Sequence, residues 1–171
     1  MRPHPTLTTK LMATGFAFLV LAMISIGLTL WVTWKLEGGA AAVNEAGRLR
    51  MYTVRMALAL ETHDTERLQT LTQDFDNSLE LLSLGTSMRP LFVPWSDDVR
   101  ARFEELRQQW TGLRHDWTGP TPPDTLTLVA QADAFVGSVN RFVDAIEAQI
   151  SRWTAALHVF QIFMMGMAVV A

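Results

Sequence analysis

The sequence predicts an all-α protein, an antiparallel up-down four-helix bundle that is continuous with two transmembrane helices. Hydrophobic residues make up 49% of the 171 residues and charged residues only 18%, which is too apolar for an ordinary soluble domain. A single tyrosine among many Leu, Ala and Met residues favours helices over sheets. Apolar residues also recur at spacings of three and four between segments that contain helix breakers, which is typical of helices with one buried face.

Residues 11–35 are predicted to form the first transmembrane helix, after a cytoplasmic N-terminus of residues 1–10. Residues 11–34 carry no charge and lie between Lys10 and Lys35. With a rise of about 1.5 Å per residue, this stretch is longer than the roughly 30 Å hydrocarbon core of a bilayer. A cleaved signal peptide is the alternative, but its apolar region is normally only about 7–15 residues long. We therefore expect an uncleaved anchor.

Residues 153–171 are predicted to form a second, truncated transmembrane helix. They contain no Asp, Glu, Lys or Arg, although His158 and Gln161 interrupt the run. Because the chain stops inside this run, we expect a fragment whose cytoplasmic part is missing; a complete protein with a C-terminal anchor is the alternative. Two spans would place residues 36–152 together on one side of the membrane. The positive-inside rule does not decide which side, because long translocated domains largely escape it.

Residues 36–152 are predicted to form four helices, because breakers interrupt them at residues 62–64, 85–95 and 118–123. Ser96, followed by two aspartates, predicts the start of one helix. The sequence Thr121-Pro122-Pro123-Asp124 has capping-box spacing with proline in the first turn, and it predicts the start of the last helix.

Each predicted helix carries an apolar stripe of the kind that forms a core. Short connections between such helices give an antiparallel up-down bundle. In chain order the stripes are Ala46, Leu49, Thr53, Met56 and Leu60; Leu68, Leu71, Phe75, Leu79 and Leu82; Val99, Phe103, Leu106, Trp110, Leu113 and Trp117; and Leu128, Ala132, Phe135, Val139, Phe142, Ile146 and Ile150.

The first of these helices, residues 36–61, has a second stripe of mostly small residues. Its spacing of three and four is that of a heptad, which suits close contact with a helix of another chain. The members of this stripe are Ala40, Val43, Gly47, Arg50, Val54 and Ala57.

Arg50 is the anomaly of the second stripe, because a guanidinium keeps its charge and no Asp or Glu lies three or four residues from it. In a parallel homodimer two Arg50 side chains would repel, unless a small anion between them accepts hydrogen bonds from both. Gly47, one turn earlier, leaves room for such an anion. The alternative is that Arg50 pairs with an acidic residue of another helix or extends into solvent.

Arg48 and Arg55 lie on a different face of the same helix. Because Glu45 precedes Arg48 by one turn, we expect these two arginines to be solvated or salt-bridged. Three arginines this close together on an acidic domain still form a positive patch that an anion could approach.

The segment Asn44-Glu45-Ala46-Gly47-Arg48-Leu49-Arg50-Met51-Tyr52-Thr53-Val54-Arg55-Met56 resembles the P-box of nitrate/nitrite sensor histidine kinases of the NarX/NarQ type. The resemblance implies a homodimer in the bacterial inner membrane, with the four-helix domain in the periplasm. It also implies that Arg50 of each subunit, with Gly47 nearby, holds one nitrate or nitrite, and that Ala46, Leu49, Met51 and Arg55 support this motif. Related segments occur in type IV pilus chemotaxis transducers. Arg48 departs from the pattern, since the relatives have a small residue there.

The resemblance further implies a signal across the membrane, by helix displacement, to a missing cytoplasmic histidine kinase that phosphorylates a response regulator. Two alternatives stay open: a chemoreceptor-type sensor of another small anion, or a ligand-free membrane-anchored structural or adaptor bundle. No catalytic set, cofactor or metal site is predicted. The cluster Glu61, His63, Asp64 and Glu66 is interpreted as a solvated turn, and Glu104 and Glu105 as solvent-facing charge. A net charge of −3 argues against nucleic-acid binding.

Overall fold

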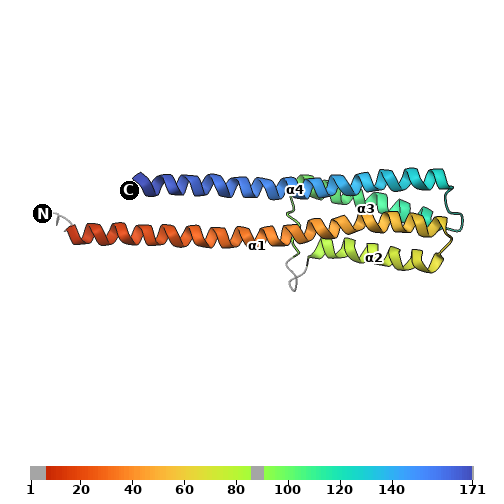
Figure 1. Cartoon of the computed structure of the whole chain (residues 1–171), viewed down its shortest axis with the longest axis horizontal. Helices are drawn as coiled ribbons and strands as arrows, with labels where there is room; N and C mark the ends of the chain where they lie inside the picture. Colours follow the sequence, from red (N-terminus) through yellow and green to blue (C-terminus); the bar gives the residue numbers. More distant parts are fainter. Residues whose placement is uncertain (1–6, 86–90, 171) are drawn as a thin grey trace. The chain divides into compact units, whose positions relative to one another are not determined.

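The computed structural model describes residues 7–85 and 91–170, and within these residues it contains four α-helices (Figure 1). They are α1 (Leu7–Glu61), α2 (Thr65–Leu84), α3 (Asp97–Thr118) and α4 (Thr125–Val170). The predicted all-α fold class is confirmed. Parts of three predicted segments lie outside the described residues, namely the N-terminus of residues 1–10, the loop of residues 85–95 and the second span of residues 153–171.

The chain divides into two compact units, Lys35–Ser151 on the one hand and Met1–Trp34 with Arg152–Ala171 on the other. In the second of these units, apolar side chains of α1 such as Phe16 and Met23 are exposed, at 68% and 65%. Among the described helices, α1 alone is long and apolar enough to cross a membrane. The second span stays a prediction.

The unit Lys35–Ser151 is an up-down bundle in which each helix is joined to the next by a polar contact. The four helices therefore follow one another around the bundle, and α4 closes the circle against α1. These contacts are Ser78 Oγ to Glu45 Oε1 at 2.6 Å for α1 and α2, Trp110 Nε1 to Asp76 Oδ1 at 2.8 Å for α2 and α3, Trp117 Nε1 to Gln131 Oε1 at 2.8 Å for α3 and α4, and Arg50 Nη1 to Asn140 Oδ1 at 3.1 Å for α1 and α4.

The predicted apolar stripes form the core of this bundle. Nearly all their members are buried, and Leu60, Leu113 and Ile150 pack against the core at its margin. Phe75 of α2 is fully buried at the centre, where its ring centroid lies 4.0 Å from that of Trp110 and 5.7 Å from that of Phe135. Aromatic residues from three helices thus fix the packing of the bundle.

Glycine allows close packing at one end of the bundle. A Cβ atom added to Gly39 would lie 2.7 Å from Ile150 Cδ1 of α4, closer than real Cβ contacts come. The backbone N–H of Phe92 donates to the Gly38 carbonyl at 3.1 Å, and Lys35 Nζ lies 3.6 Å from the centroid of the Phe92 ring. The segment before α3 is thereby fastened to α1.

The predicted helix starts have different outcomes. Ser96 caps α3, since its Oγ accepts from the Val99 N–H at 3.3 Å. The start predicted at Thr121 is wrong, because α4 begins at Thr125 and Asp124 Oδ1 accepts from the N–H of Leu126 at 3.0 Å. A proline disfavours helical backbone in the residue before it, so the two consecutive prolines delay the helix.

Replacing Phe75 with Ala is expected to destabilise the bundle by about 3–5 kcal/mol, because it leaves a cavity between two aromatic neighbours. Leu126→Ala, at a residue that is 83% exposed, is the control and should change the unfolding free energy by less than about 0.5 kcal/mol. Denaturation followed by circular dichroism measures both. Equal effects of the two substitutions would contradict this description of the core.

Candidate functional site

The segment with the P-box-like sequence, residues 44–56, lies entirely within α1 and presents two sides. Ala46 and Leu49 face the core and are fully buried. Arg50, Met51 and Arg55 are exposed. The segment therefore combines a buried face with an exposed outer face, and the supporting residues of the predicted motif are divided between them.

Arg50 and Gly47 lie together on the outer side of α1. A Cβ atom added to Gly47 would be only 3.2 Å from Arg50 Nη2, so the guanidinium lies over the glycine. Arg50 Nη1 donates to Oδ1 of Asn140 on α4 at 3.1 Å. Among the described residues, no carboxylate forms an ion pair with Arg50. A neutral amide orients the guanidinium without cancelling its charge.

Arg48, in contrast, is exposed and pairs with two residues of its own helix. Its Nη1 lies 3.1 Å from Glu45 Oε2 and its Nη2 donates to the Tyr52 hydroxyl at 2.8 Å. Glu45 is buried and also accepts from Ser78, so one carboxylate serves α1 and α2 together. The charge of Glu45 raises the pKa of Arg48. The predicted salt-bridged role of Arg48 is confirmed, whereas Ser78 had no signal in the sequence.

Arg55 and the acidic turn form no hydrogen bond with Arg50 or Gly47 in the described part of the chain. Arg55 is exposed and forms no hydrogen bond or ion pair with the described residues. Its proposed support of the motif stays a prediction. Within the acidic turn, Asp64 caps α2 by accepting from the Arg67 N–H at 3.0 Å, and Glu61 accepts from Thr125 Oγ1 at 3.2 Å.

The chain was compared with known families and proteins. Residues 31–135 match the PilJ family, described as the N-terminal part of type IV pili methyl-accepting chemotaxis transducers. The chain belongs to the PilJ family. No curated protein matches it.

Membership in the PilJ family refines the function predicted from the sequence. Together with the apolar N-terminal helix, it makes the chain a membrane-anchored sensor of the chemotaxis-transducer type. It does not support a NarX/NarQ-type nitrate sensor kinase specifically. The matched residues include the whole P-box-like segment of residues 44–56, all of α2 and α3, and the first residues of α4.

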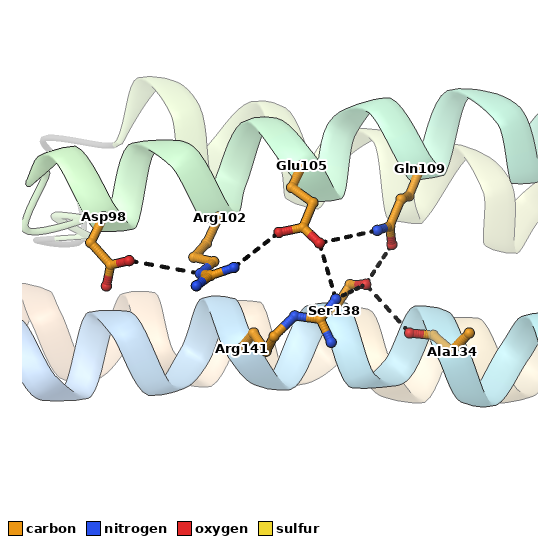
Figure 2. A network of polar contacts seen from close by, with 7 residues as sticks. All are labelled: Asp98, Arg102, Glu105, Gln109, Ala134, Ser138 and Arg141. Carbon is orange, nitrogen blue, oxygen red and sulfur yellow. Dashed lines mark hydrogen bonds and ion pairs between the residues drawn. The ribbon is translucent and has the colours of Figure 1, made fainter.

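A second group of polar residues in the unit Lys35–Ser151 joins α3 to α4 (Figure 2). Glu105 accepts from Arg102 at 3.2 Å and from Arg141 at 3.1 Å. Arg141 also donates to Ser138 Oγ at 2.9 Å, and the Ser138 hydroxyl contacts Gln109. The interpretation of Glu105 as simple solvent-facing charge is therefore wrong. The contacts between α3 and α4 join residues that are 29 and 36 positions apart, so the spacing in the sequence could not reveal them.

The network predicts a pH dependence of stability. Hydrogen bonding from Arg141 is the main reason that the pKa of Glu105 lies below its ordinary value of 4.5. A carboxylate with a depressed folded-state pKa stabilises the protein above its unfolded-state pKa, and this stabilisation is lost as pH falls through the folded-state pKa. Stability should therefore decrease below about pH 4.5, and Glu105→Gln should reduce that decrease.

Thermal unfolding at pH 3 to 7 measures this effect. Glu104→Gln is the matched control, since Glu104 is a neighbouring, more exposed carboxylate whose pairing stays within α3, with Arg107 at 3.6 Å. If the Glu105 and Glu104 variants had the same pH profile, the network would have no role in stability.

Proposed function

We propose that this membrane-anchored PilJ protein senses a small anion, which binds between the Arg50 side chains of two subunits in a homodimer. The observation that carries the proposal is the charged Arg50 guanidinium, held over Gly47 by a neutral amide. The family match supports the sensor class, and the resemblance of residues 44–56 to a P-box makes nitrate and nitrite the first anions to test.

The chemistry of the site favours a planar or forked anion. A guanidinium offers parallel N–H donors that match the oxygens of a carboxylate, nitrate or nitrite. Arg50 Nη1 donates to the neutral amide oxygen of Asn140, and an anion is a stronger acceptor for the same charged donor. Two facing Arg50 side chains would repel in the empty dimer, so anion binding would favour their approach.

The outer face of α1 supports the proposed contact between subunits. Near Arg50, Val54 is 59% exposed, Leu58 is 55% exposed and Met51 is 37% exposed. Three sizeable apolar side chains along one exposed helix face are suited to packing against the same face of a second copy. Gly47 and the small residues of the second stripe would allow the two helices to come close.

Signalling would follow from the coupling between anion binding and the arrangement of α1. A ligand shifts an equilibrium only when it binds one state more tightly, and a coupling of about 1–3 kcal/mol is ordinary. Helix α1 extends from the apolar N-terminal segment to Glu61, so Arg50 and the anchor share one helix. With residues 36–152 in the periplasm of a bacterial inner membrane, displacement of α1 relative to α4, which continues into the predicted second span, would carry the signal to a cytoplasmic kinase and its response regulator.

The test is calorimetric titration of the protein, in detergent, with nitrate, nitrite, acetate and other small carboxylates. Arg50→Ala should lower the affinity for the bound anion at least about tenfold, because charged hydrogen bonds are lost. The circular dichroism spectrum should stay unchanged, since Arg50 is exposed.

Arg67→Ala is the charge-matched control for Arg50→Ala, because Arg67 is also exposed but lies on α2. It should bind the anion as the native protein does. Undiminished binding in Arg50→Ala would refute the assignment of the site. Binding without any anion-dependent change in dimerisation would refute the part assigned to the second subunit.

A further inference from the structure

A hollow of about 380 Å³ lies between α2 and α3, away from Arg50 and Asn140. Its volume falls within the roughly 300–1,000 Å³ of small-molecule sites. Helix α2 contributes the carboxylates Asp76 and Glu80, and α3 contributes the guanidinium groups of Arg107 and Arg114. The hollow therefore has one acidic wall and one basic wall.

The charges at one end of the hollow are already satisfied. Arg114 Nη1 lies 2.9 Å from Asp76 Oδ2, and Trp110 Nε1 donates to the other oxygen of Asp76 at 2.8 Å. Both oxygens of Asp76 are thus occupied, and the pair forms a fixed end wall. The Trp110 ring is buried behind it, at 5% exposure, and Leu79 is buried beside it.

The charges at the other end are not satisfied by each other. Glu80 and Arg107 both line the hollow, yet they form no ion pair, and Glu80 has no ion-pair partner among the described residues. Arg107 has only a long contact with Glu104 of its own helix, at 3.6 Å, where both side chains are more than half exposed. The carboxylate of Glu80 can therefore accept from a cation, and the guanidinium of Arg107 can donate to an anion, in the same hollow.

We propose that this hollow is a second ligand site, for a zwitterion of the size of a free α-amino acid. The ligand's ammonium group binds Glu80, its carboxylate binds Arg107, and its side chain lies toward Trp110 and Leu79. A simple anion is disfavoured by the two carboxylates of α2, and a simple cation by the two arginines of α3. A ligand that carries both charges meets a partner for each. Because these groups are exposed, the affinity is modest, with Kd from about 0.1 to a few mM.

The site is independent of the proposed anion site, because none of its residues takes part in the contacts of Arg50. An amino acid bound here bridges α2 and α3, whereas an anion at Arg50 acts on α1. The protein then responds to two chemical signals.

The experiment is a thermal-shift screen of the whole chain, in detergent, with the common L-amino acids, followed by calorimetry of those that raise Tm. Glu80→Gln and Arg107→Gln should each weaken binding at least about tenfold, since each removes one charged hydrogen bond. Ligands with only one charge, such as propionate or ethylamine in place of alanine, should bind at least tenfold more weakly.

Two controls separate this site from the Arg50 site and from general charge effects. Arg50→Ala should retain amino-acid binding, and Glu66→Gln, an exposed carboxylate of α2 outside the hollow, should bind as the native protein does. The proposal is overturned if no amino acid binds, if both Glu80→Gln and Arg107→Gln bind normally, or if Arg50→Ala abolishes binding.

Discussion

Burial of one apolar stripe from each helix is the constraint on which the rest of the bundle depends. Once Phe75, Trp110 and Phe135 pack together at the centre, the rotation and the register of α2, α3 and α4 are fixed. The polar residues that flank each stripe then meet across helix boundaries. A buried or half-buried polar group is costly without a partner, which explains the hydrogen bonds beside the core that join α1 to α2, α2 to α3 and α3 to α4.

The same constraint gives two neighbouring arginines opposite roles. Arg48 and Arg50 are two residues apart, and a helix turns by about 200° between such positions, so their side chains leave on nearly opposite sides. Arg48 reaches the buried Glu45 and strengthens the contact of α1 with α2. Arg50 leaves on the α4 side, where its hydrogen-bond partner within the described part of the chain is the amide of Asn140. Of these two arginines, Arg50 is therefore the one whose charge no carboxylate of the described residues neutralises.

The sequence was most informative where structure is set by local periodicity. The stripes of α2, α3 and α4 could be predicted because the spacing of apolar residues reports directly on a buried face. The start of α4 could not, because the capping motif at Thr121 competed with two prolines whose backbone restriction prevailed. Asn140 as the partner of Arg50, and Arg141 as that of Glu105, depend on tertiary packing between distant segments. The ligand could not be predicted from the arginine alone, since a guanidinium binds several anions of similar shape.

The close approach of α1 and α4 at one end of the bundle depends on the missing side chain of Gly39. A Cβ atom at this position would lie 2.7 Å from Ile150 Cδ1, so any larger residue would have to displace the Ile150 side chain. In a helix that runs from the apolar N-terminal segment through Arg50, position 39 is therefore one where a single methyl group would change the packing of α1 against α4.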